Sequence, residues 1–98
     1  MPAYLINDME VTGPVAFADY AELSPPTVAL YGGRFLARGG AISLLEGDRA
    51  PKRLVVIEFP SVERARAWLD SPEYAPARRL RQGAARSNIV VVEGYAPA

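Results

Sequence analysis

The sequence predicts an α+β protein with the ferredoxin-like βαββαβ order, in which helices cover one face of an antiparallel sheet. Three observations predict this fold. Short β-rich runs alternate with longer segments of helical periodicity, and glycine or proline turns separate them. The third observation is the length of the chain, because 98 residues suffice for one hydrophobic core but hardly for two. We therefore expect a single domain over residues 1–98.

The first strand is predicted from Ala3 to Glu10, where apolar and polar residues partly alternate. The turn Thr12-Gly13-Pro14 then starts a helix, since proline is favoured in the first helical turn. Apolar residues recur at helical spacing as far as Tyr31, although the pair Pro25-Pro26 is expected to kink or restart the helix. The pair Gly32-Gly33 is expected to cap its end.

Three strands are expected in succession after this helix. They run from Arg34 to Arg38, from Ala41 to Glu46 as a short extension of the hairpin, and from Arg53 to Phe59, the strongest strand of the sequence. A helix then begins at the N-cap Ser61. It restarts at Ser71-Pro72 and continues to about Arg86, and a closing strand is predicted from Asn88 to Tyr95.

The apolar runs Leu54 to Ile57 and Ile89 to Val92 have no polar alternation. An antiparallel sheet with one face in water should alternate apolar and polar residues. We therefore expect a second copy of the chain to cover the face that the helices leave open. The alternative is a monomer with an unusually apolar open sheet.

Composition excludes several classes of function. Eleven basic and eleven acidic residues balance, so no broad attraction to nucleic acid or anionic lipid is expected. Cysteine and histidine are absent, which removes disulfides, thiolate nucleophiles, histidine bases and the usual zinc ligands. No apolar run is long enough to span a membrane, and the first residues lack the pattern of a secretory signal, so we expect a cytoplasmic protein.

Several segments together resemble a known family: YGGRFLARGG (31–40), LEG (45–47), RLVVIEFPS (53–61), SPEY (71–74) and VVVEGY (90–95). The chain is similar to the uncharacterised family called domain of unknown function thirteen-thirty, of the dimeric α/β-barrel superfamily. The resemblance implies a dimer whose two sheets form a barrel, with a small pocket between sheet and helices. It implies no established activity. Wider relatives include cofactor-independent monooxygenases, muconolactone isomerases and haem enzymes, and the lack of histidine disfavours haem.

The charged residues of the strands are the first candidates for a site. Arg34 and Arg38 alternate with Leu36 and should share one face, where they could clamp a carboxylate or an enolate. The alternative is a salt bridge with Glu46 or Glu58 at the dimer interface. Glu58 interrupts an apolar strand and is a candidate catalytic base, whereas Glu46 is a weaker candidate whose alternative is plain solvent exposure.

Tyr20 and Tyr74 lie on helix faces expected to point toward the sheet, where a phenol can donate a hydrogen bond to a substrate oxygen or simply pack in the core. Trp68 is assigned to the core. Arg81 follows Tyr74 by about two helical turns, so both are expected on one face and within reach of a pocket.

We weigh two functions. The first is a small enzyme without cofactor or metal, of the isomerase, cyclase or monooxygenase type, acting on a hydrophobic oxygen-bearing metabolite: Glu58 and Arg38 would be catalytic, and Tyr20, Arg34, Glu46, Tyr74 and Arg81 would bind substrate. The second is a non-catalytic metabolite-binding or dimerisation module. RNA binding, which occurs on this topology, is disfavoured because the central strands lack its aromatic pattern.

Overall fold

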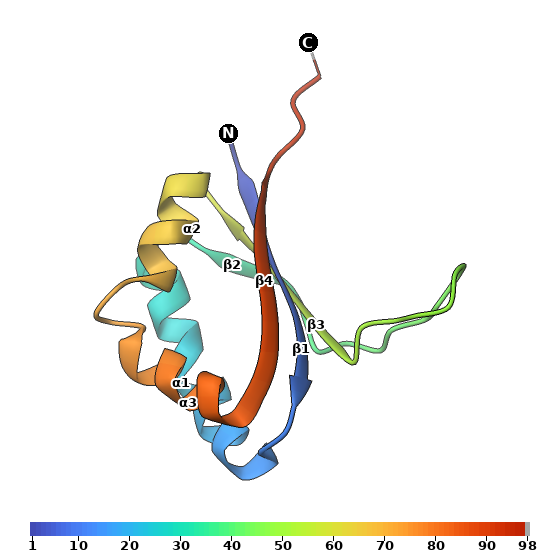
Figure 1. Cartoon of the computed structure of the whole chain (residues 1–98). Coiled ribbons are helices and arrows are strands. Elements are labelled where there is room, and N and C mark those ends of the chain that lie inside the picture. Colours follow the sequence, from blue (N-terminus) through green and yellow to red (C-terminus); the bar gives the residue numbers. More distant parts are fainter. Residues whose placement is uncertain (98) are drawn as a thin grey trace.

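The computed structural model describes residues 1–97 and has one four-stranded antiparallel sheet with its helices on one face (Figure 1). This arrangement confirms the predicted α+β, ferredoxin-like fold. None of the helices in the described chain is long and apolar enough to cross a membrane. The elements are β1 (Ala3–Val11), α1 (Pro14–Leu30), β2 (Arg34–Arg38), β3 (Arg53–Phe59), α2 (Val62–Leu69), α3 (Ala75–Ala84) and β4 (Ala85–Glu93).

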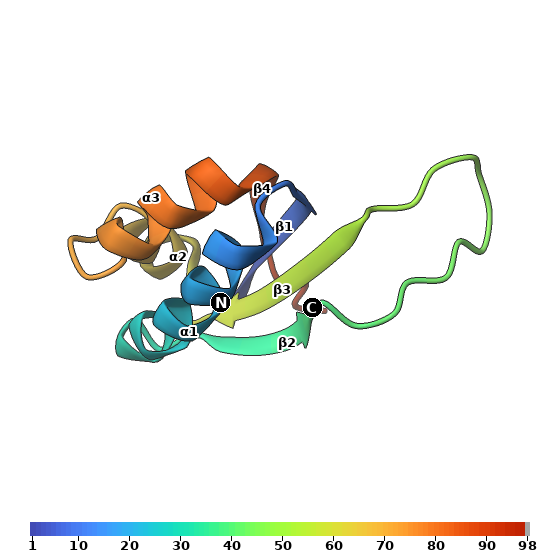
Figure 2. The same ribbon diagram turned by 90° about the horizontal axis from the view of Figure 1, so that it is seen from below.

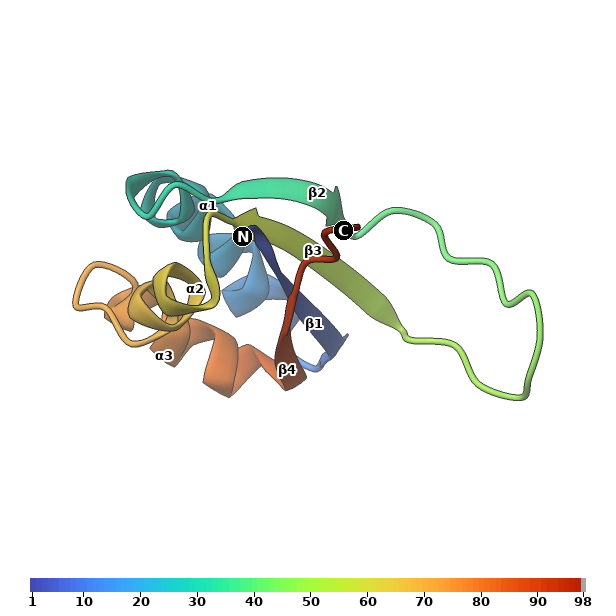
Figure 3. The ribbon, with the colours of Figure 1, turned by 90° about the horizontal axis from the view of Figure 1, so that it is seen from above.

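The sheet has the strand order β2-β3-β1-β4, so β1 lies in the middle and pairs with both β3 and β4. Figures 2 and 3 show all three helices on one side of it and no other part of the described chain packed on the other. Alternate residues therefore face either the helices or the open side. On β1 the residues Leu5, Asn7 and Met9 face the helices and are buried.

The core lies between this helix-facing side and the three helices. Its largest almost fully buried side chains are Phe59, Trp68 and Tyr74, each at most 2% exposed. The rings of Trp68 and Tyr74 stack with their centroids 4.1 Å apart, and Trp68 also contacts Phe59 at 5.6 Å. Aromatic pairs of this kind stabilise a core beyond the area that they bury. The assignment of Trp68 to the core is confirmed.

The helix α1 continues through Pro25 and Pro26 as one element, which corrects the expected restart. A proline in a helix lacks the N–H that would bond to the carbonyl four residues earlier. Pro25 therefore leaves the carbonyl of Ala21 without its helical partner, and the guanidinium group of Arg38 donates a hydrogen bond to that carbonyl instead. A side chain from the sheet thus replaces the missing bond.

The expected strand from Ala41 to Glu46 is absent. Residues 39–52 form a loop that projects from the body of the protein, and we call it the projecting loop (Figure 2). Its sequence favours a strand, but no neighbouring strand within residues 1–97 lies close enough to supply a ladder of hydrogen bonds. Leu45 at its tip is 94% exposed.

The end of the chain also differs from the prediction, because α3 ends at Ala84 and β4 begins at the next residue, Ala85, without a loop between them. The carbonyl oxygen of Ala84 accepts hydrogen bonds from the backbone N–H groups of Thr12 and Gly13, at 2.8 and 2.9 Å. These bonds join the turn before α1 to the junction after α3. The strand consequently starts three residues earlier than expected.

Candidate functional site

A cavity of about 20 Å³ lies between the helix-facing side of the sheet and the helices. Aromatic and aliphatic side chains, among them Phe17, Ile57 and Trp68, form most of its wall. A space of this size admits about one water molecule. Six polar side chains reach it: Asn7, Tyr20, Ser24, Arg38, Arg53 and Tyr74.

Arg34 and Arg38 do not share a face of β2, which corrects the expected clamp. A β-bulge between Phe35 and Ala37 shifts the pairing, so that Arg34 lies opposite Glu58 whereas Arg38 lies opposite Val55. An extra residue in a strand reverses the faces of those that follow it. Arg38 therefore points toward the helices and the cavity, and Arg34 points to the open side.

Arg38 and Arg53 approach the cavity from β2 and β3. The guanidinium group of Arg38 lies 4.8 Å from the centre of the Phe35 ring, and that of Arg53 lies 5.0 Å from the centre of the Phe17 ring. Such stacking favours the cation and holds the planar group in place. Arg53 also packs on Gly39, where an added Cβ would clash with its guanidinium group.

Neither of these arginines has a carboxylate partner within residues 1–97. The ion pairs of this part of the chain join Arg34 to Glu58 at 2.7 Å and Arg78 to Asp70 at 3.0 Å. No carboxylate lines the cavity in the described chain either. The cavity therefore combines apolar walls with one exposed and one half-buried guanidinium group, and no carboxylate of residues 1–97 pairs with either.

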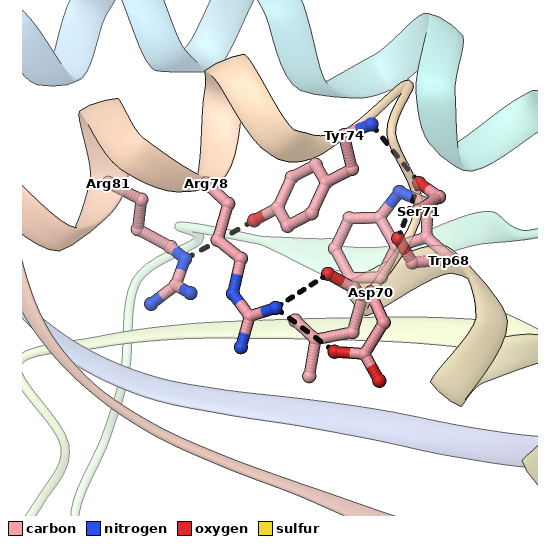
Figure 4. Close-up of polar contacts among 7 residues, drawn as sticks. Trp68, Asp70, Ser71, Tyr74, Arg78 and Arg81 are labelled. Carbon is pink, nitrogen blue, oxygen red and sulfur yellow. Dashed lines mark hydrogen bonds and ion pairs between the residues drawn. The ribbon is translucent and has the colours of Figure 1, made fainter.

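A second group of polar contacts connects the cavity to α3. The hydroxyl groups of Tyr20 and Tyr74 are 2.8 Å apart, and Arg81 Nε donates to the Tyr74 hydroxyl at 3.2 Å. Arg81 is only 5% exposed, and Figure 4 shows its guanidinium group beside the Tyr74 hydroxyl. Burial, followed by the nearby Tyr74, raises the pKa of Tyr20 far above its usual value, so its phenol is a hydrogen-bond donor at neutral pH.

The loop between α2 and α3 holds Tyr74 in position. Ser71 Oγ accepts a hydrogen bond from the backbone N–H of Tyr74 at 3.1 Å and donates one to the carbonyl of Trp68 at 2.8 Å (Figure 4). Arg78 bonds to the Leu69 carbonyl and to Asp70 across the same loop. These contacts fix the ring that closes one end of the cavity.

The structure thus brings together part of the predicted site. Tyr20, Arg38 and Tyr74 line the cavity, and Arg81 reaches it only through Tyr74. Arg34 and Glu58 pair with each other on the open side, where Glu58 cannot act as the base of this cavity. Glu46 is exposed on the projecting loop and does not line the cavity.

Three polar residues of the cavity were not predicted: Asn7, Ser24 and Arg53. A signal for Asn7 was present in the sequence, because it interrupts the inward apolar positions Leu5 and Met9. Ser24 follows Tyr20 by one helical turn and could have been placed on the same face. No group of histidine, cysteine, aspartate or glutamate residues in positions 1–97 is suited to hold a metal ion.

The family model described as "Domain of unknown function (DUF1330)" matches residues 2–95. The chain belongs to this family. The resemblance expected from the sequence is thereby confirmed. Among curated proteins, no sequence matches this DUF1330 chain significantly.

Solved structures share the fold of the DUF1330 chain. The RPA0582 protein of unknown function from Rhodopseudomonas palustris is 25% identical with a TM-score of 0.77, and the match covers 98% of this chain and 84% of that one. SnoaB, a cofactor-independent oxygenase from Streptomyces nogalater, is 16% identical with a TM-score of 0.63, covering 98% and 95%. A hypothetical Arabidopsis thaliana protein, AT3G17210, is 12% identical with a TM-score of 0.69, covering 99% and 91%.

Proposed function

We propose that the cavity binds a small, largely apolar metabolite with an anionic oxygen, and that the protein is a cofactor-independent enzyme of the isomerase, cyclase or monooxygenase type acting on it. The observation that carries this proposal is the pair Arg38 and Arg53, two guanidinium groups at one cavity with no carboxylate partner in residues 1–97. Arg38 is exposed, but Arg53 is half-buried and its Nε is a buried atom without a hydrogen-bond partner in residues 1–97, where a polar group is normally paired. A carboxylate, enolate or phenolate is the partner that a guanidinium group binds best.

The chemistry available to the cavity is stabilisation of negative charge. Arg38, Arg53 and the protonated Tyr20 are donors that can hold the oxygen of an enolate as a neighbouring C–H bond loses its proton. Because no carboxylate of the described chain lines the cavity, a substrate with an intrinsically acidic C–H bond suits it best. In the monooxygenase case, a methylene group of the substrate and one molecule of dioxygen give a carbonyl group and one molecule of water, and the substrate supplies the electrons.

The fold supports including oxygenase chemistry in this proposal. SnoaB is described as a cofactor-independent oxygenase, and at 16% identity it shares with this chain the fold alone. A non-catalytic metabolite-binding module remains the second candidate function, because the lining of the cavity offers donors and no carboxylate base in the described chain. In that case the two arginines would hold the same anion without turnover.

Entry of a ligand requires movement at the mouth of the cavity, since its present volume of about 20 Å³ is smaller than any aromatic ring. Arg38 is exposed and Arg53 is half-buried, and each is held mainly by a ring face or a backbone carbonyl. Contacts of this strength are readily exchanged for an ion pair with the ligand. The two side chains can therefore close the entrance of the cavity in the free protein and bind the anion when a ligand enters.

Isothermal titration calorimetry tests the binding step with benzoate, and with benzyl alcohol as the uncharged control. We expect benzoate to bind at least tenfold more tightly, and Arg38→Met and Arg53→Met each to lower its affinity about tenfold, since a hydrogen bond to a charged group is worth about 1.5–3 kcal/mol. Arg79→Met, which removes an exposed arginine of α3 outside the cavity, serves as the matched control.

Oxygen consumption with anthrone, an enolisable ketone, tests turnover. Enzyme-dependent uptake that falls in the Arg38→Met variant supports oxygenase activity. Benzoate binding without turnover of anthrone, or of other enolisable ketones with or without dioxygen, would favour the non-catalytic module. Equal affinity for benzoate and benzyl alcohol would refute the anion site.

We further propose that a second copy of the chain covers the open face of the sheet. One row across all four strands is apolar: Val90, Ile6, Val56 and Ala37 lie side by side in the pairing register. Val90 is 50% exposed in the single chain. A continuous apolar row on an uncovered sheet face favours contact with another protein, and in a homodimer the same row of the second copy would cover it.

Light scattering after size-exclusion chromatography tests the dimer. The wild-type protein should elute with twice the chain mass, and Val56→Glu, which places a charge in the middle of the apolar row, should elute as a monomer. Glu93→Lys, at the end of β4, is the charge-changing control and should leave the dimer intact. A monomeric wild-type protein would overturn this proposal.

A further inference from the structure

Polar side chains gather at one end of the helix-facing side of the sheet. In the pairing register Asn7 of β1 lies opposite Val55 of β3, and Arg53 of β3 lies opposite Met9, two residues farther along β1. Diagonal neighbours on adjacent antiparallel strands are about 7–8 Å apart, within reach of a long side chain. Asn7 and Arg53 are therefore neighbours on one side of the cavity, and both line it.

Each of these residues has a buried polar atom without a hydrogen-bond partner in the described chain. The atoms are Asn7 Oδ1 and Arg53 Nε, and the Asn7 residue is only 4% exposed. Unsatisfied buried polar atoms are rare in native proteins, and each calls for an explanation. The two atoms have opposite requirements, because the amide oxygen needs a donor whereas the guanidinium N–H needs an acceptor.

We propose that the ligand of the cavity is a hydroxy acid or an enolised keto acid, whose anionic oxygen binds Arg53 and whose hydroxyl group donates to Asn7 Oδ1. This inference rests on the proposed function, because it takes the cavity as the ligand site. The two groups must lie on one edge of the molecule, since Asn7 and Arg53 are neighbours. In a hydroxybenzoate, the meta hydroxyl group meets this condition. The para hydroxyl group points away, and the ortho hydroxyl group already donates to the carboxylate of its own molecule.

Isothermal titration of the full chain with benzoate and the three hydroxybenzoates tests this inference. We expect the meta isomer to bind about tenfold more tightly than benzoate, which corresponds to one hydrogen bond to a buried partner, and the ortho and para isomers to bind within about twofold of benzoate. The methyl ether of the preferred isomer can accept a hydrogen bond but cannot donate one, so it should bind no more tightly than benzoate.

Asn7→Leu, a change that keeps the approximate shape of the side chain, should reduce the affinity ratio of hydroxybenzoate to benzoate to about one. Arg79→Met should leave the ratio unchanged. Benzoate binding with no preference among the isomers, or a preference that survives Asn7→Leu, would overturn this inference and leave the anion site in place. Failure of every acid to bind would overturn the proposed function together with it.

Discussion

The buried amide of Asn7 makes the stability of the protein itself a test of the site. Asn7 Oδ1 has no partner within residues 1–97, and a buried polar group left without a hydrogen bond typically costs about 1–3 kcal/mol of stability. Leucine has nearly the same volume, and it would face Val55 and Ile89, which flank Asn7 in the sheet. We therefore expect Asn7→Leu to raise the free energy of unfolding by about 1–2 kcal/mol.

Urea unfolding followed by circular dichroism measures this change. For a domain of this size the midpoint should rise by about 1 M, at a slope near about 1–1.5 kcal/mol per molar urea. The protein concentration must be held constant, because a dimer gains stability from association. Asn7→Ala is the matched comparison: it also removes the amide, but it leaves a hole, so its gain should be smaller or reversed.

A lower midpoint for Asn7→Leu would refute this reasoning. It would mean that the amide is well bonded in the free protein, and the argument for a hydroxyl-donating ligand would lose its basis. A gain in stability together with a loss of hydroxybenzoate selectivity would instead show that the protein retains an unfavourable group for the sake of binding, as is common at functional sites.

Three further predictions follow from other contacts of the cavity. Gly39→Ala should weaken benzoate binding, because the added Cβ would displace Arg53. Gly47 is also at positive φ but has open space around it, so Gly47→Ala should lower stability through backbone strain and leave binding unchanged. Equal benzoate affinity in the two variants would contradict this. Pro25→Ala should restore a helical N–H that competes with Arg38 for the Ala21 carbonyl. Arg38 then gives up a weaker bond when it binds the ligand, so calorimetry should show tighter benzoate binding without loss of stability. The pKa of Tyr20 is raised in the folded protein, so above about pH 10 the tyrosine ionises first in the unfolded chain. The stability that depends on its neutral form is therefore fully present below about pH 10 and is lost as the pH rises above it. Urea midpoints above pH 10 should fall less steeply with pH in Tyr20→Phe than in the wild type, and equal slopes would contradict the assignment.

The order of elements could be predicted because each strand and helix has a local signal. The runs around β1, β3 and β4, and the Ser61 cap of α2, carry such signals and lie within about three residues of their predicted bounds. The strand expected between Ala41 and Glu46 was wrong for a different reason. A strand needs a partner, and whether one lies within reach depends on the whole fold, not on local sequence.

The site was predictable only in part, for two physical reasons. Strand alternation predicted that Arg34 and Arg38 share one face of β2. A β-bulge puts them on opposite faces, and nothing in this five-residue strand sequence indicates the bulge. Arg53 was interpreted as a strand residue, since its approach to Phe17 and Gly39 depends on the tertiary fold. Tyr20 was found because helical spacing predicts which face of a helix is buried. The same argument found Tyr74, although this residue lies just before the start of α3.

The direct passage from Ala84 in α3 to Ala85 in β4 bears on how the length of such a chain can change in evolution. An insertion of one residue there would move every side chain of β4 to the opposite face, sending Ile89 and Val91 outward and Val90 inward. It would also separate the Ala84 carbonyl from the turn that it binds. The projecting loop has no such constraint, so insertions and deletions should be tolerated there and excluded from the junction.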